Sequence, residues 1–365
     1  MVDYNKQIKE LEDELKKTKY NKATQGHVGI VKAKIAQLKE KQESRVQKKT
    51  GSSEYGYSVR KSGDGTVLLL GFPSSGKSTL LNKLTGAHSE VAAYAFTTLT
   101  VIPGMMEYKQ AKIQILDVPG VVSGAASGKG RGKEVLNVIL NADLVLVVVD
   151  VTHPEHYPAI LKEVWDSNIR LNKTKPEVFI KKKAYGGINI GKTVPLELDD
   201  ETLKKILREF KLMNVDVLIR SPVDVDAFID VIEGNKKYVP AITCLTKIDL
   251  TDVAKVEKIK KELNADITIS AEQDINIELL KELIFEKMDF MRVFMKEPRK
   301  DEDIKEPLII KRNFTIGDVC NKLHKDFVKK FKFARVWGKS AKFPGQRLMT
   351  NHILKDQDVL ELHMR

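Results

Sequence analysis

Apolar and polar residues alternate along much of the chain in blocks that predict strands followed by helices. Apolar, partly β-branched runs that are typical of buried strands occupy residues 67–70, 112–116, 144–149, 241–245 and 267–269. Amphipathic stretches with helical spacing separate them. This order predicts an α/β fold, with a mostly parallel sheet covered by helices on both faces. Because ligands bind at the carboxyl ends of such strands, the residues after each run are candidates for chemistry.

Segments outside this pattern predict additional domains. Residues 1–50 carry apolar positions at helical spacing and predict a helical hairpin, with a short coiled coil as the alternative. Residues 51–65 are rich in Gly, Ser and Lys and predict a flexible linker. Nearly a hundred residues separate two successive core strands, far more than one crossover helix needs. We therefore expect an α+β insertion over residues 165–238, inside a main domain formed by residues 66–164 and 239–295.

The C-terminal part of the chain predicts one more domain. A charged stretch over residues 296–306 predicts a second linker, and residues 307–365 form a compact segment after it. We expect this segment to fold as a small mixed sheet on one helix over residues 316–330. Its aromatic residues are expected in the core, with base-stacking platforms as the alternative. These residues are Phe327, Phe331, Phe333 and Trp337.

Composition indicates the class of protein and its compartment. The 365 residues are 42% hydrophobic and 31% charged, as in globular proteins. No apolar run approaches the roughly 18 residues needed to cross a bilayer, and the polar N-terminus lacks the apolar region of a signal peptide. Cys244 and Cys320 have neither redox nor zinc-binding spacing. We therefore expect a cytoplasmic protein with no membrane partner.

The net charge of +12 is concentrated at the two ends of the chain. Residues 1–50 carry a net +6 and residues 301–365 a net +5, which leaves the centre close to neutral. Basic ends predict a polyanionic partner, namely RNA or a ribonucleoprotein. Solvated lysine-rich helix faces are the alternative, since no segment reads bases.

Directly after the first strand, residues 71–79 match the pattern G-x-x-x-x-G-K-[ST] followed by Thr. A strand precedes the motif and a helical pattern follows it, as a phosphate loop requires. Its glycines let backbone N–H groups turn toward phosphate oxygens, and the helix directs its positive end at the same anion. We expect Lys77 to reach the β- and γ-phosphates and the Ser78 hydroxyl to ligate Mg²⁺. The loop residues are Gly71, Phe72, Pro73, Ser74, Ser75, Gly76, Lys77, Ser78 and Thr79.

Two further segments predict the rest of the phosphate and metal site. Asp117 follows the next apolar strand and should face Mg²⁺, although a turn cap is the alternative. It opens Asp117-Val118-Pro119-Gly120, in which the Gly120 N–H would approach a γ-phosphate. Thr98, in the preceding loop, would provide a second hydroxyl ligand, although paired threonines are equally strand formers. The predicted catalytic residues are Lys77, Thr98, Asp117 and Gly120.

A third segment, Thr246-Lys247-Ile248-Asp249, predicts which base is bound. The Asp249 carboxylate can accept hydrogen bonds from the N1–H and the 2-amino group of guanine, which adenine cannot offer. Lys247 can lay its alkyl stem along the base. The order of the segments, each after its own strand, therefore predicts a guanine nucleotide. Backbone N–H groups that can meet the guanine oxygen belong to Ser270 and Ala271.

Taken in this order, the segments resemble the Obg-type translation-factor GTPases, and more closely the developmentally regulated GTP-binding (DRG) family of archaea and eukaryotes. The resemblance extends over nearly the whole chain. It implies a P-loop GTPase domain interrupted by a small domain, an N-terminal helical hairpin and a C-terminal β-grasp domain of the TGS type. The matching segments are residues 21–24, 71–78, 96–99, 128–132, 169–172, 181–183, 186–188 and 336–338.

This resemblance also implies a function. It implies hydrolysis of GTP to GDP and phosphate, association with ribosomes or RNA in translation, and, in eukaryotic members, a partner called a DRG family regulatory protein. At the matching positions, Ser78 and Thr98 would hold Mg²⁺, residues 117–120 would sense the γ-phosphate, and Lys247 and Asp249 would select guanine. The alternative is a ribosome- or RNA-binding scaffold whose nucleotide site controls conformation with little hydrolysis.

Two residues depart from the usual GTPase pattern. Thr246 stands where an Asn amide commonly ties the base-binding loop to the phosphate loop, so we expect weaker nucleotide binding with guanine selection retained. Val121 stands where many GTPases have the glutamine that orients the attacking water, which predicts slow intrinsic turnover. Potassium is an alternative means of orienting that water, although Ser74 replaces an Asn that is frequent in potassium-activated relatives.

Two minor features have a simpler interpretation. His153-Pro154-Glu155-His156 suggests a metal pair but lacks further ligands, so no metal is expected there. The basic segment over residues 124–132 would either contact phosphate through Lys129 or Arg131, or form a plain solvated loop.

Overall fold

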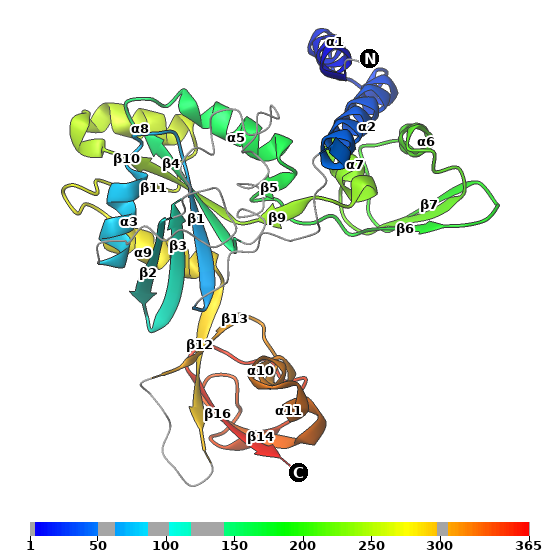
Figure 1. The fold of residues 1–365 in the computed structure, drawn as a ribbon. Coiled ribbons are helices and arrows are strands. Elements are labelled where there is room, and N and C mark those ends of the chain that lie inside the picture. The colour runs from blue at the N-terminus through cyan, green and yellow to red at the C-terminus, as the bar shows by residue number, and fades with distance from the viewer. Residues whose placement is uncertain (1–3, 50–62, 87–101, 118–141, 298–305, 365) are drawn as a thin grey trace. The chain divides into compact units, whose positions relative to one another are not determined.

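The computed structural model describes residues 4–49, 63–86, 102–117, 142–297 and 306–364 (Figure 1). Contacts between residues divide the chain into two compact units. The first unit comprises residues 1–56 and 173–238, and the second comprises residues 57–172 and 239–365. Within the described residues, no helix is both long enough and apolar enough to cross a bilayer.

A six-stranded sheet lies in the second unit, with the strand order β11-β10-β4-β1-β3-β2. Neighbouring strands are parallel throughout, except that β2 pairs antiparallel with β3 at the edge. The predicted α/β fold with a mostly parallel sheet is therefore confirmed. The strands are β1 (Gly65–Leu70), β2 (Ile102–Tyr108), β3 (Ala111–Asp117), β4 (Leu144–Asp150), β10 (Ala241–Thr246) and β11 (Ile267–Thr268).

Strand β2 is absent from the sequence prediction because Pro103 and Gly104 interrupt its apolar pattern. Proline is tolerated in an edge strand, where one side of the backbone makes no ladder hydrogen bonds. Gly104 is needed for close packing, since a Cβ built on it would lie 2.4 Å from Cγ2 of Thr85 in α3. The edge strand thus brings α3 tightly against the sheet.

Helices cover both faces of this sheet, which explains why β1 and β4 are buried along their entire length. On one face, α5 and α8 contribute Ile160 and Val256 to the core. On the other face, α3 and α9 contribute Leu80 and Leu280. Full burial of each such side chain stabilises the fold by about 1.5–3 kcal/mol. The helices are α3 (Lys77–Thr85), α5 (His156–Asp166), α8 (Val253–Glu262) and α9 (Ile277–Lys287).

A short two-stranded sheet of β5 (Ile169–Leu171) and β9 (Lys237–Val239) lies where the chain leaves and re-enters the second unit. Directly after β5, the Asn172 side chain donates to the Ala241 carbonyl at 3.0 Å and accepts from the Ala241 N–H at 2.7 Å. These two bonds anchor the end of β5 to the first residue of β10. Asn172 therefore has a structural role at this position.

The first unit joins the predicted N-terminal hairpin and the predicted insertion. Helix α2 packs along α6 through small residues: Ala33 is fully buried, and a Cβ built on Gly29 would lie 3.1 Å from Cδ1 of Ile206. Lys32 also pairs with Asp226 of α7 at 2.7 Å. The hairpin and the insertion were expected as separate segments, but they share one core. The helices are α1 (Tyr4–Lys17), α2 (Gln25–Lys49), α6 (Asp200–Glu209) and α7 (Val225–Glu233).

The strands of the insertion form a three-stranded sheet in the order β6-β8-β7. They are β6 (Val178–Lys182), β7 (Ile188–Lys192) and β8 (Val215–Ile219). Strand β8 alternates between buried and half-buried positions, so one face of this sheet packs on the core and the other is more open. The insertion is therefore an α+β structure.

A five-stranded sheet in the order β13-β12-β16-β14-β15 follows the six-stranded one. The domain boundary expected at residue 295 is wrong, because β12 pairs with β13 and β16 of this sheet. The pattern of β12 alone does not indicate which sheet it joins. The strands are β12 (Phe290–Lys296), β13 (Leu308–Lys311), β14 (Phe331–Trp337), β15 (Gln346–Leu348) and β16 (Asp358–Met364).

Two other expectations for this region are corrected. The helix expected over residues 316–330 is divided into α10 (Ile316–Leu323) and α11 (Lys325–Lys330), because His324 is extended and its ring accepts the Asp326 N–H. The aromatic residues were expected in the core, but only Phe331 is buried. Phe333 and Trp337 are half-buried, and Phe327 is exposed.

Candidate functional site

The phosphate loop begins directly after β1 and ends at α3, as the motif predicts. Gly71 is required by close packing, since a Cβ built on it would lie 2.5 Å from the Val148 carbonyl oxygen of β4. Gly76 precedes α3 with φ +87°, a left-handed conformation that favours glycine. The loop therefore turns sharply into the N-terminus of α3, whose free N–H groups favour an anion.

Lys77 is folded against its own loop. Its ammonium donates to the carbonyl oxygens of Gly71 at 3.0 Å and Phe72 at 2.8 Å. Burial lowers the pKa of Lys77, while the nearby carboxylate of Asp117 opposes that shift. The positive charge thus lies inside the loop, where a bound phosphate would be the natural counter-charge.

Ser78 and Asp117 come together at the carboxyl ends of β1 and β3. The Ser78 hydroxyl donates to Oδ2 of Asp117 at 2.9 Å. Asp117 is 2% exposed, and its other oxygen, Oδ1, has no hydrogen-bond partner among the described residues. A buried carboxylate oxygen without a partner is costly, which indicates that this oxygen meets a ligand.

Several predicted residues lie outside the described part of the chain. They include the second hydroxyl ligand, most of the γ-phosphate segment and the basic loop. These residues are Thr98, Val118, Pro119, Gly120, Val121, Lys129 and Arg131.

Thr246 ties the base-binding segment to the phosphate loop. Its hydroxyl lies 2.8 Å from the Ser75 carbonyl oxygen and 3.2 Å from that of Val149, so its single proton favours Ser75. This is the connection that an Asn amide commonly makes. Because the Thr246 hydroxyl keeps the base-binding segment connected to the phosphate loop, there is less physical reason to expect weaker nucleotide binding.

Lys247 is held by a residue that the sequence analysis did not assign to the site. Lys247 has φ +59°, and its ammonium pairs with Oδ2 of Asp150 at 2.7 Å. Burial opposes ionisation of Asp150, but hydrogen bonds from Lys247 and Thr152 outweigh it, so the pKa of Asp150 lies below its usual value. The sequence signals only that Asp150 ends the apolar run of β4; the strand pairing of the structure places it in register with Thr246 of β10.

Asp249 lies in a short 3₁₀ turn, η1 (Ile248–Leu250), after β10. Its Oδ1 is buried and has no hydrogen-bond partner within the described residues. The Ser270 N–H, however, already donates to the Ile275 carbonyl at 3.3 Å. Of the two backbone N–H groups predicted to meet a guanine oxygen, that of Ser270 is thus engaged within the chain.

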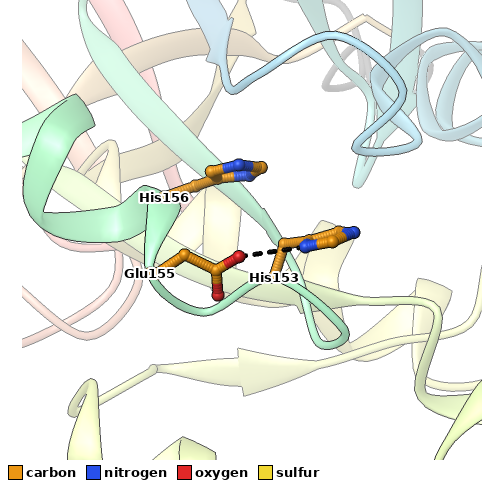
Figure 2. A group of neighbouring side chains, drawn as sticks. All are labelled: His153, Glu155 and His156. Atoms are coloured by element: carbon orange, nitrogen blue, oxygen red, sulfur yellow. Dashed lines mark hydrogen bonds and ion pairs between the residues drawn. The ribbon is translucent and has the colours of Figure 1, made fainter.

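His153, Glu155 and His156 form a cluster at the start of α5 (Figure 2). His153 Nδ1 and Glu155 Oε1 are 3.0 Å apart, and the nearest ligand atoms of all three residues lie within 4.8 Å of one another. The His156 ring stacks on Phe72 of the phosphate loop, with ring centroids 4.1 Å apart. The observed role of His156 is thus to pack the start of α5 against the phosphate loop.

Family models cover most of the chain. Residues 66–183 match a model described as a 50S ribosome-binding GTPase, and residues 185–290 match the C-terminal region of the MMR_HSR1 domain. Residues 291–364 match the TGS domain. This last match begins inside β12, in agreement with the strand pairing.

Relatives match this chain over nearly its whole length. A GTP-binding protein of Methanocaldococcus jannaschii is 51% identical over 99% of this chain and 93% of its own length. The developmentally-regulated GTP-binding protein 1 homolog of Dictyostelium discoideum is 44% identical over 97% of this chain and 98% of its own. Developmentally-regulated G-protein 2 of Arabidopsis thaliana is 42% identical over 97% of this chain and 90% of its own.

A solved structure of a GTP-binding protein from Pyrococcus horikoshii superposes with a TM-score of 0.45 and 13% identity, covering 82% of this chain and all of that one. The sequence relatives are much closer, and they extend over the GTPase and TGS regions together. With the phosphate loop, the guanine segment and both sheets in place, the chain belongs to the developmentally regulated GTP-binding family of P-loop GTPases.

Proposed function

We propose that this protein binds GTP with Mg²⁺ and hydrolyses it slowly to GDP and phosphate. The observation that carries the proposal is a pair of buried carboxylate oxygens, one of Asp117 and one of Asp249, that have no hydrogen-bond partner among the described residues. The hydrogen bond from Thr246 to Ser75 connects the two halves of this site. Asp117 supports metal binding and Asp249 supports guanine selection.

The donor atoms near the loop fit Mg²⁺, which prefers hydroxyl, carboxylate and phosphate oxygens. Ser78 and Asp117 would hold it, with Thr98 as a further ligand. When bound, Mg²⁺ neutralises charge on the β- and γ-phosphates. Lys77 and the N-terminus of α3 stabilise the charge that develops on the transferred phosphoryl group.

Slow turnover follows from Val121, whose side chain cannot orient an attacking water. Potassium or a partner would then be needed to complete the catalytic site. A scaffold that binds nucleotide with little hydrolysis is the second candidate, and the same residue favours it. The two differ in whether Lys77 matters for a measurable rate.

Guanine selection has a direct test at Asp249. Asp249→Asn should reverse the preference from GTP to XTP, because the amide can donate where the carboxylate accepts. Competition between fluorescent GDP and unlabelled GTP, XTP or ATP measures this preference. An unchanged order of affinities would contradict the assignment of Asp249.

We also propose that the switch acts on the ribosome or its RNA in the cytoplasm. The basic ends of the chain, with net +6 and +5, support a polyanionic partner. The matching family model is described as a 50S ribosome-binding GTPase, which supports the same class of partner. If the source organism is a eukaryote, a DRG family regulatory protein is a further expected partner.

One experiment separates the switch from the scaffold. Single-turnover GTP hydrolysis is measured with and without ribosomes, alongside co-sedimentation in GTP and GDP. The switch predicts faster hydrolysis on ribosomes and binding that depends on the nucleotide. Rates equal to those of Lys77→Ala in both conditions would leave only the scaffold.

A further inference from the structure

A single turn between β4 and α5 brings together three side chains that can bind a metal ion. The His156 N–H donates to the His153 carbonyl at 3.2 Å, which closes a β-turn with Pro154 in its second position. Proline favours that position because its φ is already fixed near the required value. The turn therefore holds its first and last residues, the two histidines, close to each other, with Glu155 between them (Figure 2).

The backbone of this loop is anchored at its start by Asp150. The His153 N–H donates to the Asp150 carbonyl at 3.0 Å, and the Thr152 N–H donates to the Asp150 carboxylate at 2.8 Å. Above this anchored backbone, the side chains of His153 and Glu155 are 57% and 65% exposed. An ion can therefore reach them from solvent, and little of the loop has to be ordered when it binds.

Glu155 supplies a third ligand atom and a negative charge. Its Oε1 lies 3.0 Å from His153 Nδ1, and one ligand atom from each of the three residues lies within 4.8 Å of the others. With zinc–ligand bonds of about 2.0–2.2 Å, ligand atoms around one ion stand roughly 3–3.5 Å apart, a difference that rotation of the exposed His153 side chain can close. The N-terminus of α5 disfavours a cation here, and the Glu155 carboxylate offsets that effect.

The donor atoms indicate which class of metal fits. Two imidazoles and one carboxylate form the ligand set of open zinc sites, in which water completes the tetrahedron. Mg²⁺ prefers oxygen ligands, so this cluster differs in chemistry from the Mg²⁺ site proposed at Ser78 and Asp117. No metal was expected here from the sequence, because two histidines lacked further ligands. The turn shows that Glu155 can be the third.

The cluster is connected to the nucleotide site through an aromatic stack. The His156 ring lies on the Phe72 ring, with centroids 4.1 Å apart and planes inclined by 17°. Phe72 belongs to the phosphate loop, and its carbonyl oxygen accepts a hydrogen bond from the Lys77 ammonium at 2.8 Å. An ion that fixes the His156 ring would therefore restrict Phe72 and the loop around it. Because the loop is already turned toward an anion, restricting it should favour binding.

We propose that His153, Glu155 and His156 form a Zn²⁺ site that strengthens nucleotide binding through the stack of His156 on Phe72. The effect is reciprocal, because two coupled sites change each other's affinity by the same factor. Zn²⁺ should raise the affinity for GDP about fivefold or more, and GDP should raise that for Zn²⁺ equally. The coupling rests on the proposed binding of guanine nucleotide, whereas the metal site does not.

The first test titrates the full chain, without an affinity tag, with ZnCl₂ in a calorimeter. Excess Mg²⁺ is present, so that the nucleotide site keeps its own metal. His153→Ala and Glu155→Gln should each weaken Zn²⁺ binding about a hundredfold, since even the loss of a group behind a ligand costs roughly 10–100-fold. The matched control is His27→Ala, because His27 pairs with Glu14 at 2.9 Å without a third ligand among the described residues.

A second test measures the coupling. The dissociation constant of a fluorescent GDP analogue is compared with and without Zn²⁺, in the parent chain and in His156→Phe. Phenylalanine keeps a flat ring against Phe72 but cannot bind a metal. This variant should therefore bind GDP without responding to Zn²⁺, whereas the parent chain should bind GDP more tightly when Zn²⁺ is added.

The proposal is overturned if Zn²⁺ does not bind in the presence of Mg²⁺, or if His27→Ala weakens binding as much as His153→Ala. It is equally overturned if Zn²⁺ leaves the GDP affinity of the parent chain unchanged, or changes that of His156→Phe by the same factor. Loss of Zn²⁺ binding in Ser78→Ala but not in His153→Ala would assign the ion to the nucleotide site instead. Zn²⁺ binding by a chain that binds no GDP would remove the proposed function and leave the metal site standing.

Discussion

At the scale of single residues, the nucleotide site depends on a few side chains that connect distant segments. The Thr246 hydroxyl meets the Ser75 carbonyl, 171 residues away in the sequence. Lys247 is paired with Asp150, which also accepts hydrogen bonds from the Thr152 N–H and hydroxyl. The base-binding segment is therefore held from two sides before any nucleotide contacts it.

Loss of the Thr246 hydroxyl should loosen this connection. Thr246→Val leaves the Ser75 carbonyl without its donor, so we expect GDP affinity to fall about tenfold, whereas Thr246→Asn should retain most of it. Titration with a fluorescent GDP analogue measures the change. Thr243→Val is the matched control in the same strand, since its hydroxyl lies 3.3 Å from the Tyr157 hydroxyl and not against the phosphate loop. Equal losses in both valine variants would contradict the role of Thr246.

The ion pair of Asp150 predicts a pH dependence of stability. Because the pKa of Asp150 is lowered in the folded chain, the carboxylate stabilises the fold above its ordinary pKa of 3.8. That contribution is lost as the pH falls through the lowered value. Asp150→Asn should therefore be less stable than the parent protein near neutral pH, and the difference should shrink in acid. Urea unfolding of both proteins from neutral to acidic pH measures this difference in stability. A difference that grows in acid would contradict the stabilising role given to the Asp150 carboxylate.

At the scale of elements, helix α2 and the insertion are joined by small residues. Gly29 and Ala33 allow α2 to approach α6 closely, and together they explain why two distant segments form one unit. Helical glycine is normally destabilising by about 1 kcal/mol relative to alanine, so its presence here indicates a packing requirement. Helix propensity alone would not select Gly29.

A larger side chain at Gly29 should separate the helices. Gly29→Leu would collide with Ile206, and we expect the first unit to lose about 1–3 kcal/mol of stability. Gly26→Ala is the control, because a Cβ there meets its nearest neighbours at an ordinary 3.5 Å. Thermal unfolding followed by circular dichroism compares the two. The packing argument fails if Gly29→Leu unfolds no earlier than Gly26→Ala.

At the scale of the whole molecule, the GTPase and TGS regions share buried residues within the second unit. Phe290 begins β12 of the five-stranded sheet, yet it packs in the core of the six-stranded sheet beside Phe285 and Met288. Ile309 of β13 joins the same core. The two sheets therefore meet through apolar contacts as well as through a chain connection.

Removal of the Phe290 ring should destabilise the GTPase domain, although Phe290 belongs to a strand of the five-stranded sheet. Phe290→Ala is expected to cost about 3–5 kcal/mol, the usual loss for a buried phenylalanine. Phe294→Ala, two residues along the same strand and half-buried, should cost much less. Unfolding followed through release of a bound GDP analogue gives the measurement. Equal shifts in both variants would argue against a shared core.

Much of the candidate site follows from local patterns in the sequence. The phosphate loop follows β1, Asp117 ends β3 and Asp249 comes three residues after β10, and parallel strands place such positions on one edge of a sheet. The contribution of Asp150 could not be derived in this way, because it depends on which strands are neighbours. Only the pairing of β4 with β10 brings Asp150 level with Thr246.

The sequence by itself determined the fold class, the phosphate loop and the choice of guanine, because these depend on short motifs and on the periodicity of single elements. Tertiary structure alone decided the sheet to which β12 belongs, the union of hairpin and insertion, and the Thr246 and Asp150 connections. It also decided that Phe333 and Trp337 face outward. Periodicity shows that a strand has two faces, but only the packing of α10 determines which face is covered.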